Sequence, residues 1–226
     1  MRTHLFVALA SLSVAAAPPV WKLDSPQGLE MLRGSVEAAS YRGRRALHLM
    51  PAPGTGLSEG DMLAVLSGTD FKDGTIELDL AGAPRRGTDP TSRGFVGVAF
   101  RVQREPEGLE LFYLRPTNGR ATDQLQRNHS TQYVSSPDWP WQRLRQEAPG
   151  QFESYVDLEA GAWTHVKIEV EGTRARLYVN GASQPALVVT ELKRGQSHGA
   201  VALWAHASTE AWFSNLRLRQ PDEASR

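Results

Sequence analysis

Apolar and polar residues alternate with a period of two along most of the chain after its first 34 residues. This spacing is typical of β-strands with one buried face, and Gly- and Pro-rich turns separate the segments. The predicted strands are 35–40, 45–50, 75–82, 94–102, 109–116, 162–170, 173–181, 199–207 and 211–219. Hairpins are expected at 171–173 and 208–210, and only 141–147 has a helical pattern. The sequence therefore predicts an all-β fold, a two-sheet antiparallel sandwich or jelly roll, in one domain over residues 18–226.

The same alternation assigns side chains to the two faces of each strand. The aliphatic face of 94–102, which we expect in the core, consists of Val96, Val98, Phe100 and Val102. The opposite faces of 94–102 and 199–207 carry Gly and Ala, which let a ligand approach closely. The long side chains beside them are Arg101, Tyr113, Arg115 and Trp204. We expect a groove on a curved sheet there, and an ordinary solvated sheet face is the alternative.

Residues 112–141 begin as a strand and then carry amide, hydroxyl, arginine and aromatic side chains with little aliphatic filling. Long loops without secondary structure are uncommon in compact domains and are usually functional or disordered. Sugars present hydroxyls for amide and guanidinium groups and apolar ring faces for aromatic side chains. We therefore expect segment 116–150 to cover the groove and close one end of it. The alternative is a packed Ω-type loop that plugs the edge of the sandwich.

Ten side chains from these segments are candidate ligand-binding residues for a carbohydrate. They are Arg101, Glu110, Tyr113, Arg115, Arg127, Asn128, Tyr133, Trp139, Trp141 and Trp204. The sequence assigns none of them a catalytic role.

The first residues have the layout of a secretory signal peptide: one Arg, an apolar run, and small residues from 14 to 17. We expect residues 1–17 to be removed and the protein to be periplasmic or secreted, with an uncleaved anchor as the alternative. The chain has no cysteine, so an exported form would depend on its core alone. It has 25 basic and 25 acidic residues, and this balance argues against a nucleic-acid partner.

Other motifs are weak. The run 195–199 matches G-x-S-x-G, but it precedes a strand instead of linking a strand to a helix, so we interpret it as a turn. The histidines have no zinc-binding spacing, and no cofactor is required by the pattern. The acids of DFKDG (70–74) and SEGD (58–61) leave a structural calcium open, because carboxylate oxygens are calcium ligands.

The run from GTIELDL through AWTHVKIEVEGTRARLYVNG to GAVALWAHASTEAWFSNLRLR, about residues 70–219, resembles the concanavalin A-like lectin/glucanase superfamily. Within it the chain is most similar to laminin-G-like jelly rolls and to bacterial 3-keto-disaccharide hydrolase-like domains. The resemblance implies two antiparallel sheets, sugars as ligands and, in some relatives, a structural calcium. Laminarinase-type relatives use an E-x-D-x-E run, of which this chain keeps Glu77 and Asp79 but has Ala81 in place of the last acid.

Three functions remain open at this point. The first is an exported carbohydrate-recognising module that binds a glycan in the groove. The second is a glycoside-active enzyme, a hydrolase or lyase, with a general base among Glu110, Glu153, Asp157 and His165. The third is a protein-binding adhesion module. Two carboxyls, or a carboxyl and a His, close together in the groove would favour the enzyme. The oligomeric state is not indicated.

Overall fold

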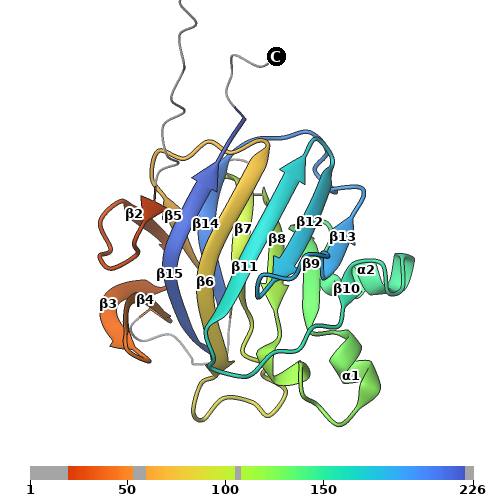
Figure 1. Ribbon diagram of the computed structural model, residues 1–226, viewed down its shortest axis with the longest axis horizontal. Helices are drawn as coiled ribbons and strands as arrows, with labels where there is room; N and C mark the ends of the chain where they lie inside the picture. The colour runs from red at the N-terminus through yellow and green to blue at the C-terminus, as the bar shows by residue number, and fades with distance from the viewer. Residues whose placement is uncertain (1–19, 53–59, 105–107, 222–226) are drawn as a thin grey trace, which may run out of the picture.

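The computed structural model describes residues 20–52, 60–104 and 108–221. The predicted leader, residues 1–17, and Glu59 of the SEGD run lie outside the described residues. The described chain forms two antiparallel sheets stacked face to face (Figure 1). This arrangement confirms the predicted all-β sandwich. Within the described residues, no helix is long and apolar enough to cross a membrane.

Sheet A, at the front of Figure 1, has the order β13-β12-β11-β6-β15-β4-β3, and β1 also pairs with β15. Its strands are β1 (Val20–Trp21), β3 (Ser35–Tyr41), β4 (Arg44–Met50), β6 (Gly74–Pro84), β11 (Thr164–Glu171), β12 (Arg174–Val179), β13 (Leu187–Val189) and β15 (Thr209–Arg219).

Sheet B, behind it, has the order β10-β9-β8-β7-β14-β5-β2. Its strands are β2 (Leu29–Arg33), β5 (Asp61–Leu66), β7 (Val96–Gln103), β8 (Gly108–Leu114), β9 (Thr131–Ser136), β10 (Glu153–Ser154) and β14 (Ala200–His206). The short helices are η1 (Pro116–Asn118), α1 (Gln124–Asn128) and α2 (Trp141–Glu147). Both α-helices lie beside β9 and β10 at one end of this sheet (Figure 1).

The core lies between the sheets and is built from the aliphatic faces that the alternation predicts. Val98 pairs with Phe112 of β8 on one side and Leu203 of β14 on the other. These three side chains therefore share a face, and all are buried in the main core. The hairpin β11–β12 turns where it was expected. The hairpin expected at 208–210 was wrong, because β14 and β15 belong to different sheets and the chain crosses from sheet B to sheet A between them. The predicted helix over 141–147 is confirmed as α2.

The alternation of β7 breaks at one residue, Arg101. Its φ is 52°, and the β7–β8 register shifts between Phe100 and Gln103, which marks a β-bulge. After the bulge, Val102 belongs to the apolar cluster on the outer face of sheet B, not to the core. Assigning Val102 to the core was wrong for this reason. The bulge likewise re-aims Arg101.

We expected segment 116–150 to be a loop without regular strands, and this was wrong for its middle part. Residues 131–136 form β9, which pairs along its whole length with β8. Its period-two pattern is masked because polar Gln132 and Ser135 are buried beside Tyr133. The rest of the segment, with α1 and α2, lies at the end of sheet B.

Candidate functional site

The outer face of sheet B carries its own apolar cluster. Gly97 of β7 pairs with Tyr113 of β8 and with Trp204 of β14, so the two aromatic residues flank it. A Cβ on Gly97 would stand 2.7 Å from the Cβ of Tyr113. Because Gly97 has no side chain, the two rings meet above it with centroids 5.1 Å apart. The small residue predicted for the floor is what brings these rings together.

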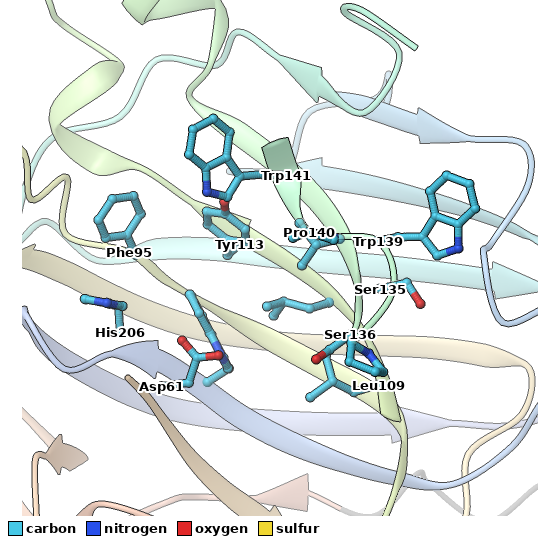
Figure 2. Close-up of a pocket in the computed structure, with 14 residues that line it drawn as sticks. Asp61, Phe95, Leu109, Tyr113, Ser135, Ser136, Trp139, Pro140, Trp141 and His206 are labelled. Carbon is cyan, nitrogen blue, oxygen red and sulfur yellow. The ribbon is translucent and has the colours of Figure 1, made fainter. Parts of the chain in front are cut away.

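A pocket of about 300 Å³ lies on this face, against β8, β9 and β14, with residues 137–141 along one side. Phe95 approaches the Tyr113 ring edge-on, with centroids 6.2 Å apart. Figure 2 shows Phe95, Tyr113 and Trp141 grouped together, with Asp61 and His206 beside each other at another part of the wall. The lining residues are Asp61, Phe95, Leu109, Leu111, Tyr113, Val134, Ser135, Ser136, Pro137, Trp139, Pro140, Trp141, Trp204 and His206.

Arg115 orders one end of this pocket. Its Nη2 donates to Tyr113 Oη at 2.9 Å and to Gln132 Oε1 at 3.1 Å, and its Nη1 donates to Glu153 Oε2 at 3.3 Å. The guanidinium carbon also lies 5.1 Å from the Tyr113 ring centroid and 5.9 Å from that of Trp141. Burial raises the pKa of Tyr113 to about 12, so the phenol stays neutral. Arg115 therefore fixes the aromatic wall and has few donors left for a ligand.

Arg145 of α2 supports Trp141 from over one face of its ring. Its Nε and Nη2 donate to Glu153 at 2.8 and 2.5 Å, and its guanidinium lies 4.6 Å from the Trp141 ring centroid. Burial would raise the pKa of the Glu153 carboxyl, but the hydrogen bonds from Arg145 and the neighbouring cations hold it below its usual value. The Trp141 indole remains 37% exposed. Trp141 is therefore fixed in place by its neighbours and still offers an accessible aromatic surface.

A second hollow, of about 420 Å³, begins on the other side of Trp141. It shares Phe95 and Trp141 with the first pocket, so the two hollows adjoin at these residues. Burial lowers the pKa of His129, so its ring is neutral near pH 7. The remaining lining residues are mainly polar: Arg93, Arg115, Asn118, Asp123, Leu125, Gln126, His129 and Arg145. The groove therefore has an aromatic half and a polar half, with Trp141 between them.

Asp61 and His206 form a titratable pair in the first pocket that the sequence analysis missed. They are direct partners in the β5–β14 register, and both line the pocket. His206 Nδ1 accepts from the Ser208 backbone N–H at 3.2 Å, so in the neutral ring Nε2 carries the proton. Burial lowers the pKa of His206, and the Asp61 charge opposes this. The signal for His206 was present, because it shares a predicted strand face with Trp204.

The structure brings together part of the predicted residue set. Tyr113, Arg115, Trp141 and Trp204 surround the groove as expected. Asn128 lines a third hollow, of about 540 Å³, which shares Leu125, His129 and Arg145 with the second.

Arg127 and Trp139 have other surroundings. Arg127 donates to Tyr155 Oη at 2.7 Å and lines none of these three hollows. Two cations, Arg143 and Lys193, lie over the Trp139 ring, at 3.7 and 4.7 Å from its centroid. In Figure 2 the ring points away from Tyr113 and Trp141. Trp139 therefore borders the pocket without offering its ring to it.

Placing Arg101 in the groove was wrong. The bulge turns its side chain away from the groove and towards three turns of the chain, where it is fully buried. It donates to the carbonyls of Lys72, Gly172 and Gly195 at 2.7–3.0 Å, and to Asp73 at 3.3 Å. Arg101 thus ties three turns together and has no access to a ligand.

Placing Glu110 and Tyr133 in the groove was also wrong, because both face the interior of the sandwich. Tyr133 Oη donates to Glu110 Oε2 at 2.5 Å and accepts from the Lys193 N–H at 2.8 Å. The Arg194 N–H donates to Glu110 Oε1 at 2.9 Å. Burial raises the pKa values of both side chains. The pair anchors the chain at 193–194 to sheet B.

The other acids considered from the sequence do not meet in the groove. Asp79 lies on the outer face of sheet A, where it accepts from Arg44 and Asn215 and contacts His165 Nδ1 at 3.0 Å. Asp157 is exposed and paired with Arg120. The run 195–199 is irregular chain before β14.

Within residues 20–52, 60–104 and 108–221, no three His, Cys, Asp or Glu side chains are grouped so that they could hold a metal ion. Of the acids considered for calcium, Asp70 contacts His198 Nδ1 at 2.7 Å, and Asp73 accepts from Arg101 and the Gly172 N–H.

Among solved structures, the fold is similar to three sugar-related proteins at low identity. The carbohydrate binding module CBM66 from Bacillus subtilis has a TM-score of 0.57 at 16% identity, over 85% of this chain and 96% of that one. The exoplasmic/lumenal domain of VIP36, in a Ca²⁺/Man-bound form, has 0.54 at 12%, over 86% and 84%. Bacillus licheniformis β-glucanase has 0.51 at 12%, over 92% and 100%. These likenesses establish the fold.

A search of curated protein sequences found no match. Residues 44–219 match the family described as the 3-keto-alpha-glucoside-1,2-lyase-like domain, which spans both sheets and the groove. The expected concanavalin A-like jelly roll is confirmed by this match and by the structural neighbours. The chain belongs to the 3-keto-alpha-glucoside-1,2-lyase-like domain family.

Proposed function

We propose that this protein binds a glycan in the groove on the outer face of sheet B, with a sugar ring stacked on Trp141. The observation that carries the proposal is the position of this indole. It is 37% exposed and stands where the aromatic pocket meets the polar hollow. Sugar recognition needs an apolar surface for the ring face together with convergent hydrogen-bonding groups for the hydroxyls. Trp141 and its polar neighbours supply both.

The polar hollow offers groups of the right kind beside Trp141. Among the described residues, Arg93 donates to the Pro90 and Ser92 carbonyls through Nη1, which leaves its Nη2 and Nε available. The Asp123 carboxylate, exposed at the start of α1, accepts from the Gln126 N–H through Oδ1 and has a second oxygen free for a hydroxyl. Guanidinium and carboxylate groups form directional, charge-assisted hydrogen bonds with hydroxyls.

The test is a glycan-array screen of the mature chain, followed by isothermal titration of the hits. We expect binding to at least one oligosaccharide, and the same binding with a chelator present, since the groove contains no grouped metal ligands among the described residues. Tryptophan fluorescence should respond to the same glycans, because Trp141 and Trp204 border the groove. A screen without any glycan hit would contradict the proposal.

A glycoside-active enzyme is the second candidate, and one observation favours it. Asp61 and His206 are a carboxyl and an imidazole on paired strands in the same pocket. A neutral His held in one tautomer is suited to general acid–base catalysis near pH 7. Product analysis with Asp61→Asn and His206→Gln tests this role. Turnover of a glycan hit that both variants abolish, with binding retained, would establish the enzyme.

We also propose that the protein is exported to the periplasm or beyond, after removal of residues 1–17. The supporting feature is the apolar run that follows Arg2 and ends in small residues. Cell fractionation followed by intact mass measurement is the check. A full-length chain in the cytoplasm would contradict export without affecting the glycan proposal.

A further inference from the structure

The first pocket has an apolar floor, while Asp61, Ser136 and His206 stand elsewhere on its wall. Its floor runs along β8 and β9, where Leu111 pairs with Val134 at the centre and Leu109 pairs with Ser136 at one end. Two polar atoms at the other end, Tyr113 Oη and Gln132 Oε1, already accept from Arg115. The middle of the pocket therefore offers aliphatic and aromatic surface with hardly any free hydrogen-bonding groups.

A sugar ring carries hydroxyls on most of its carbons. Each hydroxyl that is buried without a partner costs about 1–3 kcal/mol. The floor at Leu111 and Val134 has no partner to offer, so a sugar ring placed there would lose more than it gains. An apolar group has no such cost and gains about 25 cal/mol for each Å² that it buries.

The space also suits an apolar group joined to a sugar. The pocket has about 300 Å³, whereas an apolar cavity of about 150 Å³ is known to accept benzene. Trp204 is 5% exposed and its Nε1 is buried, so this residue contributes apolar ring surface to the wall.

We propose that the ligand is a glycoside with an apolar aglycone, aryl or alkyl, and that the groove divides it at Trp141. The sugar occupies the polar hollow with Arg93, Asn118 and Asp123. The aglycone crosses Trp141 into the first pocket and lies on Leu109, Leu111 and Val134. This inference rests on the proposed glycan binding and adds the chemical class of the ligand.

The experiment compares methyl, phenyl and n-hexyl glycosides of glucose, galactose, mannose and N-acetylglucosamine, by isothermal titration. For the sugar that binds, we expect the phenyl or hexyl glycoside to bind at least about ten-fold more tightly than the methyl glycoside. Saturation-transfer NMR should show strong transfer to the aglycone protons. The phenyl and hexyl arms distinguish an aryl from an alkyl aglycone.

Two variants at one position test the pocket itself. Val134→Thr keeps the volume and adds a hydroxyl to the floor, and Val134→Phe fills the space. Both should remove most of the preference for the apolar aglycone, measured as the ratio of phenyl or hexyl to methyl glycoside affinity in the same variant. Val188→Thr is the matched control, because Val188 is exposed on β13 of the other sheet. It should change nothing.

The possible outcomes distinguish a failure of the aglycone pocket from a failure of glycan binding itself. Equal affinity for methyl, phenyl and hexyl glycosides would overturn the aglycone pocket and leave glycan binding intact. A preference that survives in both Val134 variants would also overturn it, because the apolar group would then lie elsewhere. Failure of every glycoside to bind, together with an empty glycan screen, would remove both.

Discussion

Arg115 Nη2 donates to Tyr113 Oη across 2.9 Å, two residues apart on the same face of one chain segment. The same guanidinium also meets Gln132, Glu153 and the His129 carbonyl. One buried cation therefore holds β8, β9 and β10 together at the end of the groove where Trp141 stands. The site and the stability of this part of the sheet depend on the same residue.

Replacing Arg115 should therefore affect both properties. Arg115→Met leaves the Tyr113 hydroxyl and the Gln132 oxygen buried without their donor, and leaves Glu153 with Arg145 and His129. We expect the free energy of unfolding to fall by about 2–4 kcal/mol. Urea denaturation followed by tryptophan fluorescence measures it. Arg127→Met is the control, because Arg127 is only partly buried and its guanidinium donates to Tyr155 Oη. An equal loss in both variants would refute the role of Arg115.

Arg101→Met should separate stability from binding. Arg101 is fully buried among three turn carbonyls and Asp73, far from the groove lining. We expect a loss of about 3 kcal/mol in the free energy of unfolding, because the turn carbonyls lose a shared donor. Glycan affinity, measured by titration at a temperature where the variant is folded, should remain within about two-fold. A ten-fold loss of affinity in the folded variant would show that the sequence-based placement of Arg101 was correct after all.

Gly97→Ala should lower the stability of the protein and disturb the floor of the groove. The new methyl group would clash with the Phe112 carbonyl oxygen and stand 2.7 Å from the Cα and Cβ of Tyr113, so β8 must shift away from β7 and move Tyr113 relative to Trp204. Overpacking of this kind costs about 1–3 kcal/mol. Thermal unfolding gives the stability, and near-ultraviolet circular dichroism reports the Tyr113–Trp204 contact. Unchanged values for both would mean that the sheet absorbs the methyl group elsewhere.

These relationships show how far the sequence could lead. Strand alternation correctly placed Tyr113, Arg115 and Trp204 on the same face of one sheet, because a period of two is a local property of the chain. It failed at Arg101, because a single residue with φ of 52° reverses every later assignment in the strand. It also failed at Tyr133, because β9 buries polar residues on both faces and so lacks the hydrophobic signal of a strand.

The Asp61–His206 pair shows a different limit. The two residues lie far apart in the chain and meet only through the β5–β14 register. Register follows from how whole strands pair, and no local pattern in either strand reports it. The face of His206 could be predicted, but its partner could not.

The free energy of unfolding should depend on pH through the ionisation of Glu110. Burial raises the pKa of this carboxyl in the folded state, so the folded protein favours the protonated form. Stability contributed by Glu110 is then complete below the unfolded pKa, about 4.3, and is lost as pH rises through the folded pKa.

Glu110→Gln removes this titration. The free energy of unfolding of the wild type, measured in urea from pH 4 to pH 8, should fall relative to the variant as pH rises, and then level off. The Tyr133 and Arg194 contacts are retained in part by the amide, which limits other effects. A difference between the two proteins that grows in favour of the wild type with rising pH would contradict the buried, proton-favouring site.

The central claim is that the Trp141 indole binds a sugar, and a pair of tryptophans tests it most directly. Trp141 is accessible where the two hollows meet, whereas Arg143 and Lys193 lie over the Trp139 ring. Isothermal titration of the best glycan from the array should show that Trp141→Ala weakens binding by about ten-fold or more, and that Trp139→Ala, once shown to be folded, binds within about two-fold of the wild type. Unchanged affinity in Trp141→Ala would contradict the account.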